Sequence, residues 1–164
     1  MSREEFTEAV LSAEASLFHV AYSILRNEAD CADAVQEAVL KAYAARDALK
    51  KPSYFKTWLT RIVINECYTM FRKRRWQISL KESGEPADES MYIHEEYLDL
   101  YRAIGELKEK DKICVLLFYM EDYTVAQIAD VLDIPEGTVK SRLNRARLRL
   151  RELLGADEEN AAMG

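Results

Sequence analysis

Glycine, proline, cysteine and histidine are scarce in this chain of 164 residues, which has five, three, three and two of them. So few glycines and prolines argue against a β-rich fold with many tight turns. The three cysteines, Cys31, Cys67 and Cys114, are far apart and odd in number, which predicts neither a disulfide framework nor a metal pair. We therefore expect buried thiols in a reducing, cytoplasmic compartment, with no metal, no cofactor and no catalytic residue.

Long hydrophobic runs are absent as well. The longest stretch without Lys, Arg, Asp or Glu covers residues 15–25, which is eleven residues. A membrane span needs about 20 residues, so we expect no membrane insertion. Hydrophobic residues at 49% and charged residues at 32% instead predict a packed core with a charged surface.

Charge is distributed unevenly along the chain, although its net value is −6. Residues 56–75 hold six basic residues and one acidic residue, and residues 136–152 hold six basic and two acidic. Residues 76–97 hold one basic and six acidic residues. Two basic segments in an acidic protein predict two contacts with a polyanion, and the acidic surfaces predict a different partner.

Apolar residues recur at intervals of three and four along most of the chain, which predicts helices. Two capping boxes, Ser2 with Glu5 and Thr124 with Gln127, mark helix starts. The predicted helices cover about 3–26, 30–46, 53–75, 98–107, 111–119, 124–132 and 136–154. The sequence thus predicts an all-α protein with two small helical domains, 1–76 and 98–155. An acidic flexible linker, 77–97, joins them, and a frayed tail, 156–164, follows.

Residues 124–154 have the pattern of a helix-turn-helix, in which a short helix, a turn at 133–135 and a longer basic helix follow one another. The first turns of the second helix place polar side chains where base edges are read. The predicted base-reading residues are Lys140, Ser141, Asn144 and Arg145, and the predicted phosphate contacts are Thr138, Arg142 and Arg147. The alternative is a basic, solvated face on an ordinary helical hairpin.

Residues 54–76 mix basic and aromatic side chains, a combination that suits unstacked bases of a single strand. The competing interpretation is that some of these aromatics, Phe55 and Trp58 above all, belong to the core.

Taken together, three segments resemble a known family: DAVQEAVLKAY (33–43), YFKTWLTRIVINECYTMFRKRR (54–75) and YTVAQIADVLDIPEGTVKSRLNRARLRL (123–150). Residues 4–154 resemble the bacterial RNA polymerase sigma factors of the extracytoplasmic-function (ECF) group. The resemblance implies a cytoplasmic, non-enzymatic protein that binds core RNA polymerase and directs promoter-specific initiation. It also implies control by an anti-sigma factor in an envelope or other stress response.

The resemblance assigns roles to residues of this chain. The polymerase would be bound by Asp33, Gln36, Glu37, Val39 and Leu40. The single-stranded −10 element would be bound by Lys50, Lys51, Pro52, Ser53, Lys56, Thr60, Asn65, Thr69 and Arg72, with residues 50–53 forming a pocket for a flipped base. The duplex −35 element would be read by the second basic helix, and the acidic linker would imitate RNA inside the polymerase.

Two positions depart from the commoner family pattern. The loop 50–53 has fewer Arg, Gly and Ser residues than usual, so the resemblance does not define the −10 sequence. Phe118 stands where some relatives have a basic residue, which removes one expected contact with the DNA backbone.

Three other interpretations fit parts of the chain. A regulator with a phospho-receiver domain would need alternating strands and helices before the linker. A protein-binding adaptor, such as an anti-sigma factor or scaffold, would use its basic helix on an acidic partner. A small nuclease would need acidic metal ligands near the basic helices.

Overall fold

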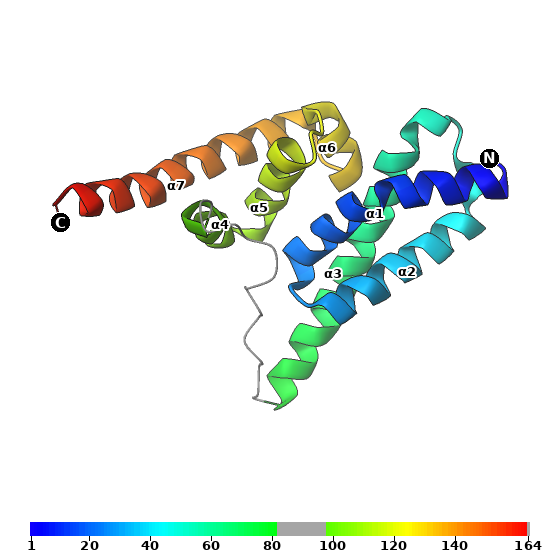
Figure 1. Cartoon of the computed structure of the whole chain (residues 1–164), viewed down its shortest axis with the longest axis horizontal. Coiled ribbons are helices and arrows are strands. Elements are labelled where there is room, and N and C mark those ends of the chain that lie inside the picture. Colours follow the sequence, from blue (N-terminus) through cyan, green and yellow to red (C-terminus); the bar gives the residue numbers. More distant parts are fainter. Residues whose placement is uncertain (82–97, 164) are drawn as a thin grey trace. The chain divides into compact units, whose positions relative to one another are not determined.

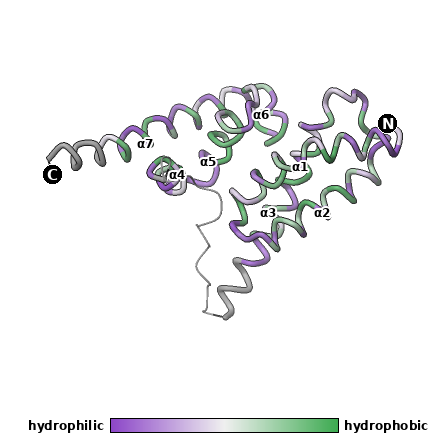
Figure 2. The backbone as a smooth tube through the Cα atoms, in the orientation of Figure 1, coloured by the Kyte–Doolittle hydropathy of each residue, from purple (hydrophilic) through white to green (hydrophobic). Residues whose placement is uncertain are grey.

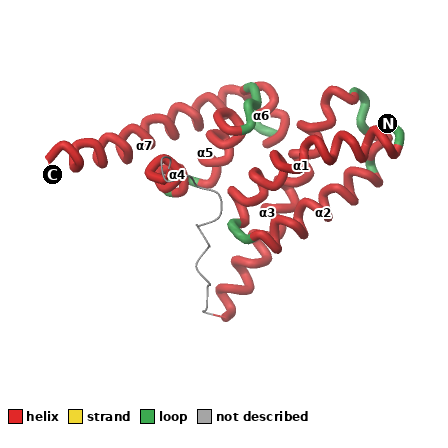
Figure 3. Tube along the Cα trace, in the orientation of Figure 1, coloured by secondary structure: helices red, strands yellow, loops and turns green. Residues whose placement is uncertain are grey.

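A computed structural model of the chain describes residues 1–81 and 98–163, and every regular element in those ranges is a helix (Figures 1 and 3). This confirms the all-α prediction. It also excludes a phospho-receiver domain in residues 1–75, because that domain requires strands. None of the helices in the described ranges combines the length and the hydrophobicity needed to span a bilayer.

The chain divides into two compact units, Met1–Glu89 and Ser90–Gly164. Most of the predicted linker, residues 82–97, lies outside the described residues. Its first five residues, 77–81, are helical and continue the helix that precedes them.

The first unit is a bundle of three long helices that all contact one another. They are α1 (Arg3–Leu25), α2 (Glu28–Ala44) and α3 (Phe55–Lys81), with the short 3₁₀ helices η1 (Arg46–Ala48) and η2 (Pro52–Tyr54) between α2 and α3. Leu17 of α1 and Leu59 and Val63 of α3 are fully buried in the core of this bundle. Cys31 and three alanines of α2 are buried too, and such small side chains let helices approach closely.

Local signals fix both ends of α1. The Ser2 hydroxyl accepts a hydrogen bond from the Glu5 backbone N–H at 3.2 Å, and the Glu5 carboxylate accepts one from the Ser2 N–H at 2.7 Å. The helix ends at Arg26, whose φ of 53° lies in the left-handed region. Asn27 then caps α2 by accepting a hydrogen bond from the Asp30 N–H at 2.9 Å. A turn of two residues therefore connects α1 to α2, which begins two residues earlier than the sequence predicts.

The second unit contains α4 (Leu98–Gly105), α5 (Glu109–Val115), the π-helical turn η4 (Leu116–Met120), α6 (Val125–Leu132) and α7 (Glu136–Met163). The predicted capping box opens α6: the Thr124 hydroxyl accepts from the Gln127 N–H at 3.1 Å, and the Gln127 side chain accepts from the Thr124 N–H at 2.9 Å. Asp133, with a φ of 55°, ends α6 before the turn to α7. Val139, Leu143 and Ala146 bury the inner face of α7.

Two helices are longer than the sequence analysis predicts. Helix α3 continues to Lys81 rather than ending near residue 75, because the first glycine or proline after Pro52 is Gly84. Helix α7 continues to Met163 rather than ending at residue 154. A glycine inside a helix costs about 1 kcal/mol, and the alanines and glutamates after Gly155 favour helix strongly enough to continue past it. The prediction of a frayed tail from residue 156 is therefore wrong for the backbone of 156–163.

Candidate nucleic-acid and polymerase interfaces

The helix-turn-helix of the second unit presents part of its predicted DNA-reading set to solvent. Lys140, Ser141 and Asn144 are exposed on the first turns of α7, and Thr138 is half-buried. The core-facing side of α7 is formed by other residues, Val139 and Leu143, which are buried. The exposed polar side chains can therefore approach a DNA groove without disturbing the core.

Arg145 has a partner that the sequence analysis did not foresee. Its Nε atom donates to Asp111 Oδ2 at 2.8 Å, and its Nη2 atom donates to Asp111 Oδ1 at 2.7 Å. This hydrogen-bonded carboxylate raises the pKa of the Arg145 guanidinium. The predicted base reader is thus held by the first turn of α5.

Arg147 and Arg142 also contact the elements that precede the helix-turn-helix. The Arg147 Nε atom donates to the Tyr119 hydroxyl at 2.6 Å, and its Nη1 atom donates to Asn144 Oδ1 at 3.1 Å. Its guanidinium lies over the rings of Phe118 and Tyr119, 5.9 and 5.6 Å from their centroids. Arg142 is half-buried, and burial raises the pKa of the Cys114 thiol by more than the guanidinium of Arg142 lowers it.

The predicted flipped-base loop follows η1 and runs into η2, which begins at Pro52. Lys50, Lys51, Pro52 and Ser53 are all exposed, as is Lys56 at the start of α3. A cluster of aromatic side chains lies at the start of α3. Phe6 packs edge-to-face on Tyr43 and Phe55, with ring centroids 5.2 and 5.4 Å apart. Phe55 is buried, which agrees with the core interpretation of that residue.

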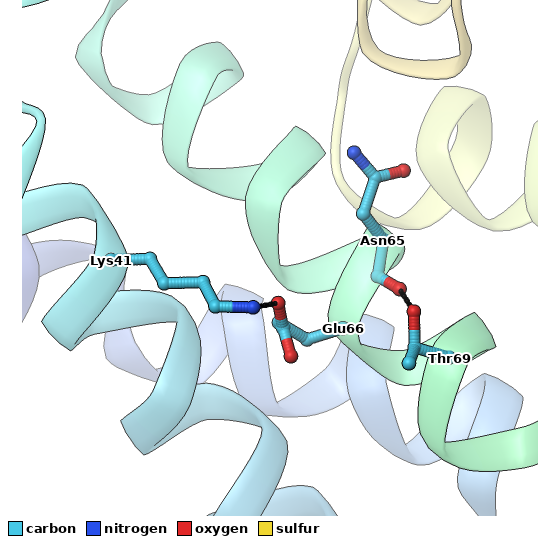
Figure 4. A network of polar contacts seen from close by, with 4 residues as sticks. All are labelled: Lys41, Asn65, Glu66 and Thr69. Atoms are coloured by element: carbon cyan, nitrogen blue, oxygen red, sulfur yellow. Dashed lines mark hydrogen bonds and ion pairs between the residues drawn. The ribbon is translucent and has the colours of Figure 1, made fainter. Parts of the chain in front are cut away.

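Thr60 is wrongly predicted as a contact with the non-template strand, because its side chain is 0% exposed. It lies five residues before Asn65, which is roughly 140° around a helix. Asn65 and Thr69 are exposed on the outer face of α3, where the Thr69 hydroxyl donates to the Asn65 carbonyl at 2.9 Å (Figure 4). Arg72 is exposed further along the helix. Figure 2 shows that the later part of α3 is hydrophilic.

The sequence analysis did not assign Arg61 and Trp58 to this surface. Arg61 is exposed and Trp58 is half-buried. Arg61 lies four residues before Asn65, and Trp58 lies seven before it, so both share its side of the helix. The regular spacing 58, 61, 65, 69 and 72 was available in the sequence as a signal.

The predicted polymerase-binding residues share the outer face of α2. Asp33, Gln36 and Glu37 are exposed, Val39 is half-buried, and Leu40 is 66% exposed. Two ion pairs attach the helix to α3, one between Lys41 and Glu66 (Figure 4) and one between Arg74 and Asp30. The acidic face with one exposed leucine is therefore carried on a helix fixed to the bundle.

The three cysteine thiols are buried and unpaired by disulfides, which confirms the prediction of buried thiols. Burial raises the pKa of Cys31 to about 11 and that of Cys67 to about 12, and it also raises the pKa of Cys114. The thiolate is the reactive form, so all three are unreactive near neutral pH.

Two family models match the chain, one on each side of the undescribed segment. Residues 10–77 match the model of sigma-70 region 2, and residues 97–150 match that of sigma-70 region 4. The ECF RNA polymerase sigma factor SigM of Mycobacterium tuberculosis is 33% identical over 132 residues, which are 79% of this chain and 67% of SigM. The ECF RNA polymerase sigma-E factor of Escherichia coli is 35% identical over 136 residues, which are 72% of this chain and 70% of that protein.

A solved structure agrees with these relatives. The sigma factor RpoE of Bartonella quintana, determined in complex with the anti-sigma factor NepR, superimposes with a TM-score of 0.81 at 26% identity. The match covers 94% of this chain and 99% of RpoE. The chain therefore belongs to the ECF RNA polymerase sigma factors.

Proposed function

We propose that the two units divide promoter recognition between them, with the −10 element bound by the first and the −35 element by the second. As an ECF sigma factor, the protein binds core RNA polymerase and directs promoter-specific transcription initiation. The observation that carries the division is that each unit has its own exposed polar helix face. One face includes Asn65 on α3, and the other includes Lys140 on α7.

In this proposal the first domain is residues 1–76 and the second is residues 98–155, with 77–97 as the connection. The outer face of α2 binds the polymerase through Asp33, Gln36, Glu37, Val39 and Leu40. Leu40 is exposed, which supports this assignment, because covering an apolar side chain with a partner removes it from water and stabilises the complex.

The −10 element is bound as a single strand along α3. Lys50, Lys51, Pro52 and Ser53 surround a flipped base, and Lys56, Asn65, Thr69 and Arg72 contact the strand beyond it. Arg61 and Trp58 share that face and join the proposed set. Flipping a base out of the stack costs a few kcal/mol, so this unit acts only when the polymerase contributes binding energy.

The −35 element is read in the duplex by α7. Lys140, Ser141 and Asn144 contact base edges, because lysine suits guanine and asparagine suits adenine. Thr138 and Arg147 contact phosphates, since backbone contacts set the register of a protein on DNA. Phe118 faces Arg147 in the structure, so the backbone contact that a basic residue there would make is supplied by Arg147 instead.

An anti-sigma factor is the proposed inhibitor, as in the complex of the related RpoE. Both units carry exposed apolar side chains, including Leu11 on α1 and Leu148 on α7, which such a partner would cover. The protein is not an enzyme in this proposal, because the polymerase supplies the chemistry. It acts in the bacterial cytoplasm, where the polymerase works, and responds to envelope or other stress signals relayed by that inhibitor.

Reconstituted transcription tests the proposal. Core polymerase, the purified chain and a promoter library from the source genome are combined, and the transcript starts are sequenced. Starts that depend on the chain and share a −35 and a −10 sequence are expected. Substituting Lys140 should change the −35 preference alone, and substituting Asn65 should change the −10 preference alone. Starts that are independent of the chain would contradict the proposal.

A further inference from the structure

We propose that Asp111 is a positioning residue for −35 recognition, and that Arg145 is a clamp on α7 rather than a reader of bases. By holding Arg145 against α5, Asp111 fixes the rotation of α7 about its axis. This inference rests on the proposed −35 binding by α7. It changes the role that the sequence analysis gave to Arg145.

The geometry of the pair is that of a fixed clamp. Two parallel hydrogen bonds, at 2.8 and 2.7 Å, join the guanidinium of Arg145 to both carboxylate oxygens of Asp111. The Asp111 side chain is 4% exposed, whereas that of Arg145 is 56% exposed. Two parallel hydrogen bonds from a guanidinium constrain the orientation of the arginine side chain as well as its distance from the carboxylate. The single ammonium contact of a lysine constrains only the distance.

Ser141 lies four residues before Arg145, about 40° around the helix, and is the proposed base reader nearest to it. Arg145 lies on a different side of α7 from Lys140 and Asn144. It is five residues from Lys140, which corresponds to roughly 140° around the helix. Arg142 lies three residues before Arg145, about 60° around the helix, and its charge partly offsets the rise that burial causes in the pKa of the Cys114 thiol of α5. The side of α7 that carries these two arginines therefore faces α5, while Lys140 and Asn144 remain on the exposed face.

The rotation of α7 decides where Lys140, Ser141 and Asn144 meet the base edges. Small displacements of positioned groups have large effects on recognition and catalysis. Asp111 is buried, so it has no route to the DNA of its own. Any effect of its substitution on sequence preference must pass through Arg145 and the orientation of α7.

The test uses the full chain bound to core polymerase. The probe is a duplex pool with a randomised −35 window placed upstream of a pre-melted −10 bubble. Bound DNA is selected and sequenced, which gives the preference at every base pair. The variants are Asp111→Asn, Arg145→Gln, Arg145→Lys and the double variant Asp111→Asn/Arg145→Gln. Arg149→Gln is the matched control, because Arg149 pairs with Glu152 at 3.1 Å on the exposed surface of the same helix.

Asp111→Asn and Arg145→Gln should each reduce discrimination by about tenfold, which is within the range of coupled contacts. The loss of preference should be spread over all the base pairs of the −35 window that the wild type discriminates. The double variant should lose no more discrimination than either single variant. Arg145→Lys should restore only part of the loss, and the control should match the wild type. Circular dichroism of each variant, compared with the wild type, confirms that the helices are intact.

Three results would overturn the inference. In the first, Arg145→Gln removes the preference at one base pair while Asp111→Asn leaves the preference at that pair intact, which would make Arg145 a base reader. In the second, Asp111→Asn behaves as the wild type. In the third, Arg145→Lys shows full discrimination, which would mean that a positive charge suffices without the two parallel hydrogen bonds. A wild-type complex that enriches no −35 sequence would instead contradict the proposed function, and this inference with it.

Discussion

Arg147 donates a hydrogen bond from Nε to the hydroxyl of Tyr119 at 2.6 Å, which joins the helix-turn-helix to the π-helical turn before it. The two residues are 28 positions apart in sequence. Because Arg147 also donates to Asn144, the tyrosine orients two of the proposed DNA contacts at once.

Tyr119→Phe removes the acceptor and keeps the ring. A hydrogen bond of this kind contributes about 1 kcal/mol, so DNA binding by the polymerase complex should weaken by about fivefold. The loss should be similar for all −35 sequences, because Arg147 is a proposed phosphate contact. Equilibrium binding of the complex to labelled duplexes measures it. In an Arg147→Gln background the same change should have no effect, and tighter binding by Tyr119→Phe would show that the tyrosine competes with phosphate.

Lys140→Ala should weaken discrimination between the preferred −35 sequence and its single-base variants. A lost bidentate base contact costs about 1–3 kcal/mol. Competition binding with duplexes that differ at one base pair measures the effect. An equal loss on every duplex, with a smaller salt dependence, would instead identify Lys140 as a phosphate contact.

Thr60→Ala and Asn65→Ala separate the core of α3 from its binding face. Thr60 is buried, so its truncation should lower the free energy of unfolding by about 1–2 kcal/mol. Asn65 is exposed, so its truncation should change stability by less than about 0.5 kcal/mol. Urea denaturation measures both, and open-complex formation on a promoter should be impaired only by Asn65→Ala when both variants are folded. The reverse pattern would place Thr60 at the DNA.

The buried thiols predict a loss of stability at alkaline pH. The pKa values of Cys31 and Cys67 are raised to about 11 and about 12 in the folded chain, from an ordinary value near 9. Below pH 9 both states keep the proton, so the contribution to stability is complete. Between pH 9 and about 12 the unfolded chain ionises first, and stability falls as pH rises.

Denaturant unfolding at a series of pH values measures this loss. Thiol labelling provides a second check, since native cysteines should react slowly at pH 8 and quickly once urea unfolds the chain. Fast labelling of the native protein at that pH would contradict the burial of the thiols.

The sequence was sufficient to predict most of the helices, because their signals are local. The capping boxes at Ser2 and Thr124 act within one helical turn, and apolar spacing of three and four defines the buried faces. The same spacing placed Asn65 and Lys140 on outer faces. The burial of Thr60 was not predicted, although this residue lies between Leu59 and Val63, both of which are fully buried. Its polar side chain was given more weight than its position on the helix.

Other features depend on contacts that one helix cannot reveal. The partners Asp111 and Arg145 lie 34 residues apart, and the pair forms only when α5 packs against α7. The lengths of α3 and α7 were underestimated for a different reason. Apolar spacing predicted that α3 ends near residue 75 and α7 at residue 154, but helix-favouring residues continue both helices beyond those points, in α7 through Gly155.

The most direct test of the central claim is a titration of the fluorescently labelled chain with core RNA polymerase, followed by anisotropy. Saturable binding with a dissociation constant on the order of nanomolar is expected. It should be strongly weakened by Leu40→Arg or Asp33→Arg on the outer face of α2. Glu8→Arg, which changes the charge as much as Asp33→Arg but on the exposed side of α1, should leave it unchanged. No saturable binding, or equal loss in all three variants, would contradict the account of the chain as a sigma factor that engages the polymerase through α2.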